Sequence, residues 1–227
     1  LLKTLSIYID KKNLFEHDFG ISIYGTKSFY EVWEKVCSEV FDNKLSTSLD
    51  NLILPTELHN DYHDEKDKSL FDIIDKPVWI PLGIKDGHTV KYSLIPDIIS
   101  LYNLNEGMCF AIFDAKYYNI VLDEFNLRNH PGVGDITKQY LYQLAYNEFI
   151  LKHDFKYVQN VFLMPTEGND FKLIGEAKMK ILEGISYPPL ENIKVVKLSA
   201  RKIYQYYLNE NKIDISDELK FLNNDFK

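Results

Sequence analysis

Residues 95–118 read IPDIISLYNLNEGMCFAIFDAKYY, and this stretch decides the fold that we expect. It holds two short apolar runs, 98–102 and 108–113, which are rich in β-branched and aromatic residues and are separated by turn-forming residues. Such runs predict two β-strands joined by a short connection. An acidic residue stands at one end of each run, Asp97 before the first and Asp114 after the second. If the strands pair as neighbours, the two carboxylates converge on one edge of the sheet.

The two carboxylates and a nearby lysine form a group with a clear chemical use. A carboxylate at the end of a buried strand is costly unless a metal or hydrogen bonds compensate its charge. Asp97 and Asp114 could therefore hold Mg²⁺ or Mn²⁺, with the backbone carbonyl of Ala115 as a further ligand. Strand alternation places Lys116 on the same face as Asp114. Lys116 could position or deprotonate an attacking water, or offset charge on a phosphate, so the group suits phosphodiester hydrolysis.

A helix is expected before this stretch. Apolar residues recur at helical spacing between residues 28 and 42. Residues 43–69 are polar and charged, and they predict a surface excursion without chemistry. Short apolar or alternating runs at 78–80 and 90–95 predict two further strands, so that a hairpin or meander follows the helix.

Further elements are expected after residue 118. Asp135 is placed to be the N-cap of a helix that runs to about Lys152. The later patterns predict strands at 157–164, 171–174 and 193–198 and a helix at 200–209. The expected fold class is α/β, with a mixed central β-sheet flanked by helices in the order αβββαβ and with C-terminal additions. We expect a single domain over residues 1–227, with a core at about 28–165 and C-terminal strands and a helix at about 166–210.

The composition is that of an ordinary soluble globular protein, with 45% apolar and 26% charged residues. No apolar run is long enough to span a bilayer and no secretion signal is visible, so we expect a cytoplasmic protein without a membrane segment. Cys37 and Cys109 lie in apolar patterns without a C-x-x-C partner, which predicts two buried, reduced thiols. The chain begins at Leu1 rather than at methionine, which indicates a fragment of a longer protein.

The net charge of −8 argues against a strong DNA-binding protein, because DNA affinity comes largely from lysine and arginine. A metal site nevertheless needs local acidity, and a subunit of a larger complex can leave most DNA contacts to its partners. We therefore expect weak DNA binding by the chain alone. Nothing in the sequence resembles a P-loop, a helix-turn-helix or a base-reading zinc module, so sequence specificity would reside elsewhere.

Two motifs resemble those of the PD-(D/E)XK nuclease superfamily: Pro96-Asp97 and, after sixteen intervening residues, Asp114-Ala115-Lys116. Three longer blocks resemble LlaJI-type restriction endonucleases and their McrC-like relatives, namely FYEVWE at 29–34, FDAKYY at 113–118 and GDITKQY at 134–140. The resemblance implies a restriction-endonuclease-like core. It also implies a Mg²⁺- or Mn²⁺-dependent endonuclease that hydrolyses double-stranded DNA, as the nuclease subunit of a bacterial restriction system. An McrB-like nucleotide-hydrolysing motor and recognition subunit would be its partner.

The resemblance adds residues to the site. In such nucleases the first helix contributes an acidic residue to the metal site, and Glu34 is the matching position. A helical wheel places Glu34 beside the apolar arc and Glu31 on the outer face, although Glu31 and Glu39 stay open as alternatives. The second helix carries Gln139, Gln143 and Tyr146, whose spacing of four and three places them on one polar stripe. By resemblance this stripe would face the active site and touch the substrate backbone, whereas an ordinary exposed helix face is the alternative.

Other functions remain open from the sequence. One is a catalytically degenerate nuclease fold that serves as a scaffold or DNA-binding subunit of a restriction complex, and another is cleavage of RNA. His59 and His63 have the spacing of a zinc pair, but Asn60 occupies the place where a metalloprotease helix carries glutamate. We therefore expect no zinc site there, and we interpret His130 as part of a surface loop.

Overall fold

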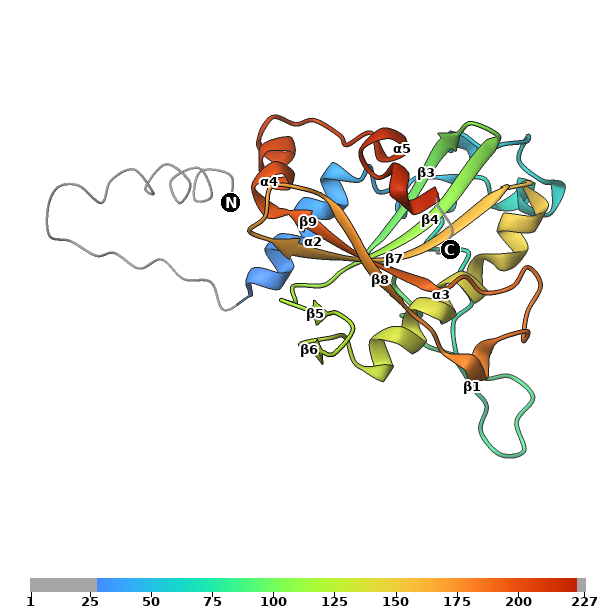
Figure 1. Cartoon of the computed structure of the whole chain (residues 1–227). Coiled ribbons are helices and arrows are strands. Elements are labelled where there is room, and N and C mark those ends of the chain that lie inside the picture. Colours follow the sequence, from blue (N-terminus) through green and yellow to red (C-terminus); the bar gives the residue numbers. More distant parts are fainter. Residues whose placement is uncertain (1–27, 224–227) are drawn as a thin grey trace, which may run out of the picture.

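The centre of the molecule is a five-stranded mixed β-sheet (Figure 1). The structure is a computed structural model, and it describes residues 28–223. In spatial order the strands are β3 (Ile98–Leu104), β4 (Gly107–Ala115), β7 (Tyr157–Thr166), β9 (Ile193–Ser199) and β8 (Lys172–Ala177). β4, β7 and β9 run parallel to one another, whereas β3 and β8 are antiparallel to their neighbours. The predicted mixed central sheet is therefore confirmed.

Helices cover both faces of this sheet (Figure 1). The long helices are α2 (Phe29–Val40), α3 (Val133–Lys152) and α4 (Ala200–Leu208). Cys109, Ala111 and Phe113 of β4 pack in one core cluster with α2 and α4, whereas Phe110 and Ile112 pack in another with α3. This separation follows from strand alternation, which sends successive side chains to opposite faces. β4 is buried on both faces and is therefore apolar almost throughout.

The predicted strands at 78–80 and 90–95 are where the expectation differs most from the structure. Only β1 (Val78–Trp79) and β2 (His88–Thr89) form, as a separate two-stranded ribbon, and residues 90–95 are not a strand. The central sheet therefore receives two strands before α3 rather than three, and the order αβββαβ is wrong for this sheet. The apolar composition of the segment suggested strands, but most of its side chains are exposed instead of packing against the sheet.

The segment 43–69 is more than a surface excursion. It contains two short 3₁₀ helices, η2 (Leu49–Asn51) and η3 (Asn60–Glu65). Leu45 and Leu49 are buried in the core cluster that also holds α3, so this segment covers part of one sheet face. Widely spaced leucines without a regular period gave no sequence signal for this packing.

The start of α3 is one turn earlier than expected. Gly132 is the N-cap, and the Asp135 carboxylate accepts a hydrogen bond from the Gly132 N–H at 3.1 Å. Asp135 was therefore wrongly predicted as the N-cap, although it does satisfy a backbone donor of the helix start. Cys37 and Cys109 are free and buried, as predicted. Within residues 28–223, no helix has the length and apolar character needed to cross a membrane.

The remaining elements are short. Before α3 lies a second ribbon of β5 (Val121–Leu122) and β6 (Leu127–Arg128). The others are η4 (Lys180–Leu182), α5 (Ile215–Glu218) and η5 (Lys220–Asn223). The predicted C-terminal strands and helix correspond to β8, β9 and α4.

Candidate active site

Asp97 and Asp114 lie next to each other at one end of the sheet. β3 and β4 pair so that Ile98 lies opposite Phe113, which puts the residue before β3 beside the end of β4. The Ala115 N–H donates a hydrogen bond to Asp97 Oδ2 at 3.0 Å. The Asn43 side chain fixes this strand end, because its amide donates to the Asp97 carbonyl at 2.9 Å. The convergence expected from strand pairing is thus present.

Lys116 completes a charged cluster at the same edge. Its Nζ lies 2.8 Å from Asp114 Oδ1 and 3.4 Å from Asp135 Oδ1 at the start of α3. The ammonium group of Lys116 and the carboxylate of Asp114 thus form a close ion pair at the end of β4. Ala115 points away into the apolar core, as the alternation predicts.

The electrostatics of the cluster follow from burial. Asp114 is only 3% exposed, and burial together with the adjacent Asp97 carboxylate raises its pKa. Burial also raises the pKa of Asp97. Lys116 opposes both effects, but a single ammonium group cannot neutralise two carboxylates. The cluster is therefore an acidic, partly desolvated position that would be stabilised by an added cation.

Glu34 of α2 lies within electrostatic reach of this cluster. Burial raises the pKa of Glu34, and the next largest influences on it are the charges of Lys116 and Asp114. Glu31 is exposed, and Glu39 pairs with Lys35. Of the three glutamates considered from the sequence, Glu34 is the one that the structure brings to Asp114 and Lys116.

The predicted stripe on α3 lies elsewhere. Gln143 is fully buried, with its amide donating to the Pro189 carbonyl at 3.0 Å and its oxygen accepting from Asn160 at 2.7 Å. Tyr146 is also fully buried, and its hydroxyl donates to the Leu70 carbonyl at 3.0 Å. Gln143 and Tyr146 therefore hold α3 against its neighbours. They are neither exposed on the helix surface nor accessible to a substrate.

Gln139 is buried as well, and its amide donates to the Ile112 carbonyl at 2.8 Å. It thus attaches α3 to the strand that carries Asp114. Asp135 and Tyr142 of α3 are the residues that lie within electrostatic reach of the charged cluster. Burial and the charges of Asp114 and Asp97 raise the pKa of Tyr142 to about 12. The sequence reasoning missed Asp135 and Tyr142 as site residues, although their spacing of four and three around Gln139 was a usable signal.

The donor set fits a hydrated hard cation better than an enclosed metal cage. Within the described part of the chain, no group of three or more histidine, cysteine or acidic side chains is arranged to hold a metal. Mg²⁺, however, commonly uses one or two carboxylates and keeps several waters. The adjacent, largely buried carboxyl groups of Asp97 and Asp114 match that requirement. The side-chain hydrogen bonds of His59 and His63 are made to backbone groups of their own surface segment.

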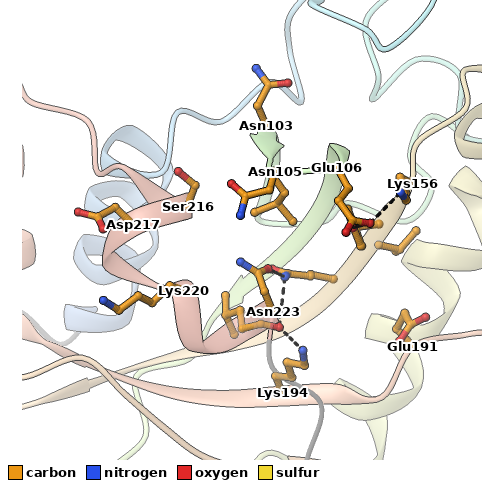
Figure 2. Close-up of a pocket in the computed structure, with 15 residues that line it drawn as sticks. Asn103, Asn105, Glu106, Lys156, Glu191, Lys194, Ser216, Asp217, Lys220 and Asn223 are labelled. Carbon is orange, nitrogen blue, oxygen red and sulfur yellow. Dashed lines mark hydrogen bonds and ion pairs between the residues drawn. The ribbon is translucent and has the colours of Figure 1, made fainter.

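A cavity of about 770 Å³ lies at the opposite end of the sheet (Figure 2). Charged groups of both signs line it, among them Glu106, Lys156 and Lys194. Lys156 pairs with Glu106 at 2.9 Å. Tyr157 of β7 lies beside Cys109, whereas Phe162, five residues further along, lies beside Asp114. This cavity is therefore separate from the acidic cluster.

The fold and the cluster together define a class: an α/β protein whose mixed sheet carries an acidic pair and a lysine at one end. Comparison with known proteins gives the family. The family model described as LlaJI restriction endonuclease matches residues 1–60 and 57–201. This chain therefore belongs to the LlaJI restriction endonuclease family.

A curated relative supports the same family. The chain is 33% identical over 225 residues to the type II restriction enzyme BsuMI component YdjA of Bacillus subtilis (strain 168). The alignment covers 98% of this chain but 42% of the relative, so the chain spans less than half the length of that protein. No solved structure matches the chain significantly.

Proposed function

We propose that this chain is the metal-dependent, DNA-cleaving part of a bacterial restriction system, with an active site of the PD-(D/E)XK type. The observation that carries the proposal is the cluster of Asp97, Asp114 and Lys116, in which Lys116 Nζ lies 2.8 Å from Asp114 Oδ1. Membership of the LlaJI restriction endonuclease family supports the same reaction class. Double-stranded DNA is the proposed substrate.

The residues of the cluster have distinct proposed roles. Asp97 and Asp114 would hold Mg²⁺ or Mn²⁺, with the Ala115 carbonyl as a further ligand. Glu34 would act as a water anchor, because no three acidic side chains of the described residues are arranged to hold a metal directly. The bound cation would polarise the scissile phosphate and promote ionisation of water. Lys116 would hold the attacking water or offset the charge that develops on the phosphate.

Asp135 would act on the reaction through Lys116. The Asp135 carboxylate is fixed by the Gly132 N–H at the start of α3 and lies 3.4 Å from Lys116 Nζ. It therefore restricts where the ammonium group can point. Asp135 is in this sense a positioning residue, and the buried Tyr142, two turns further along α3, would help to exclude water from the cluster.

A partner protein is part of the proposal. The Bacillus subtilis relative is named as a component of a type II restriction enzyme. We propose that the present chain likewise works with other subunits, including an McrB-like nucleotide-hydrolysing motor that would supply recognition. The net charge of −8 supports this division, because a chain with this charge is poorly suited to bind DNA strongly alone.

The direct test is cleavage of plasmid DNA by the purified chain with Mg²⁺ or Mn²⁺, at high protein concentration. Asp114→Asn and Lys116→Met should each abolish cleavage. Lys156→Met is the matched control, because it also removes a lysine from an ion pair, with Glu106, but at the opposite end of the sheet. It should cleave like the wild type. Cleavage that persists in both site variants would sink the assignment.

A degenerate scaffold is separated from a nuclease by metal binding. A nuclease should gain thermal stability on addition of Mg²⁺, and Asp97→Ala or Asp114→Ala should remove that gain. A scaffold should show no gain in either form. Parallel assays with RNA of the same sequence test the substrate, since preference for RNA would contradict a DNA endonuclease.

A further inference from the structure

The ribbon that contains β1 and β2 projects from the body of the molecule as an arm. We define the arm as residues 76–92, and Figure 1 shows its loop extending beyond β1. Most of its large apolar side chains are exposed: Val78 52%, Trp79 71%, Ile80 63%, Leu82 105%, Ile84 56% and Tyr92 59%. Exposed apolar residues gathered on one projecting element indicate a contact surface rather than a core.

The arm has a defined structure. Val78 pairs with Thr89, and the Val90 N–H donates to the Pro77 carbonyl at 3.0 Å. Gly87 packs so closely under the opposite strand that an added Cβ would lie 2.4 Å from a methyl carbon of Val78. The arm is thus held as a ribbon, and it can present its side chains in a fixed arrangement.

The base of the arm is tied to the strand that carries Asp97. The Ser93 hydroxyl donates to the Asp75 carbonyl, which closes the base, and Leu94 packs on the core cluster beneath. Asp97 follows Ser93 by only four residues, a span of at most about 14 Å. A substrate that occupies the acidic cluster therefore lies within reach of the arm.

The charge of the arm is opposite to that of the whole chain. It contains Lys76, Lys85 and Lys91 against the single acidic residue Asp86, whereas the chain has a net charge of −8. Lysine is depleted at the core of protein interfaces but is a standard contact to DNA phosphates. The local excess of lysines on an otherwise acidic chain therefore favours a nucleic acid over a protein partner.

We infer that the arm is the element with which this chain grips duplex DNA beside the cleavage site. A two-stranded ribbon fits into the major groove, where exposed apolar side chains can contact thymine methyl groups. Lys85 and Lys91 would contact phosphates, while Trp79 would pack on the DNA. The inference rests on the proposed function, because it assumes that DNA is the substrate of the acidic cluster.

The two tryptophans of the chain allow a direct test. Trp33 is fully buried, whereas Trp79 on the arm is 71% exposed. Fluorescence quenching by acrylamide should therefore report on Trp79, and Trp79→Phe should remove the quenchable component. We expect duplex DNA, added to the 227-residue chain at low salt in EDTA, to protect Trp79 from acrylamide. Protection should saturate with the same midpoint as DNA binding measured by anisotropy of a labelled duplex.

Lysine variants test the phosphate contacts. Lys85→Ala combined with Lys91→Ala should weaken binding. The slope of log affinity against log salt should become less negative by about two, because each lost phosphate contact contributes about one. Lys156→Ala combined with Lys220→Ala removes the same charge beside the distant cavity and is the matched control. It should leave the slope unchanged.

The outcomes separate this inference from the proposed function. If the chain cleaves DNA in Mg²⁺ while Trp79 stays fully quenchable and the arm variants bind normally, the inference is overturned and the nuclease assignment stands. If a protein subunit protects Trp79 and DNA does not, the arm is a protein interface and the inference is likewise overturned. If the wild type neither binds nor cleaves DNA, both fail.

Discussion

At the scale of single residues, Asp114 illustrates a conflict between stability and function. Its carboxylate is buried beside Asp97, and both effects raise its pKa. Replacing Asp114 by asparagine removes a carboxyl group whose ionisation is made unfavourable by burial and by Asp97. Without divalent cations, Asp114→Asn should therefore raise the free energy of unfolding, by on the order of 1 kcal/mol. Urea denaturation in EDTA at neutral pH measures this.

The same substitution should abolish any stabilisation by Mg²⁺ if Asp114 is the ligand that we propose. Asp217→Asn, on the short helix α5, is a matched change at an exposed position. It should alter neither quantity. A loss of stability in Asp114→Asn without cations would contradict the view that the acidic pair is strained in the absence of metal.

Asp135 makes a second residue-scale prediction. Asp135→Asn keeps an oxygen for the Gly132 N–H but removes the charge that lies 3.4 Å from Lys116. Folding stability should change little, whereas the cleavage rate should fall about 10- to 100-fold, as is common when a supporting partner of a catalytic group is lost. Single-turnover cleavage measures the rate. Activity equal to that of the wild type would show that the Asp135 charge does not position Lys116 for the reaction.

At the scale of elements, the end of α3 holds a histidine that should make stability depend on pH. His153 is buried, its Nδ1–H donates to the Phe149 carbonyl at 2.8 Å, and its Nε2 accepts from the His59 N–H at 3.0 Å. Burial lowers the pKa of His153. The stability that neutral His153 provides is present above the pKa of the unfolded state, about 6.5, and is lost as pH falls through the lower folded value.

The free energy of unfolding should therefore fall between about pH 7 and pH 5, by on the order of 1 kcal/mol from this residue. His153→Gln should be less stable at pH 7 and show a shallower decline. His63→Gln changes an exposed histidine of the neighbouring segment and should keep the wild-type profile. Parallel profiles for the wild type and His153→Gln would show that this histidine does not cause the pH dependence.

The elements also show which parts of the fold the sequence could predict. β3, β4, α2 and most of α3 were predictable, because they combine regular periodicity with burial against the core. The strand at 78–80 was predicted correctly, but neither its separation from the central sheet nor the absence of a strand at 90–95 could be predicted, since exposed and buried apolar residues look alike in a sequence. The packing of residues 43–69 was missed because scattered leucines have no period.

The candidate site divides in the same way. Asp97, Asp114 and Lys116 could be placed together because strand pairing and alternation are strict geometric rules. Gln143 and Tyr146 were misplaced because helical spacing shows which residues share a face but not what that face contacts. The proximity of Asp135 to Lys116 could not be predicted, because it depends on where the start of α3 lies relative to the end of β4. The periodicity of the sequence carries no information on that tertiary arrangement.

At the scale of the whole molecule, the acidic net charge sets how the chain can engage DNA. A chain with a net charge of −8 repels DNA at long range, so its contacts with phosphates must be few and local. If the arm supplies most of them, the dependence of binding on salt should be shallow. We expect a slope of log affinity against log salt of about −2 to −3 for the chain alone, since each phosphate contact contributes about −0.9.

Binding by the assembled restriction system should be steeper, because the proposed partner subunits would add their own phosphate contacts. The two slopes can be compared by anisotropy titrations of one labelled duplex between 25 and 200 mM salt, in EDTA, with the chain alone and then with its partners. A difference of about one phosphate contact should be measurable. A slope for the isolated chain as steep as that of the assembly would mean that this acidic chain carries the DNA binding itself. The division of labour between cleavage here and recognition elsewhere would then have to be abandoned, even if the acidic cluster were the active site.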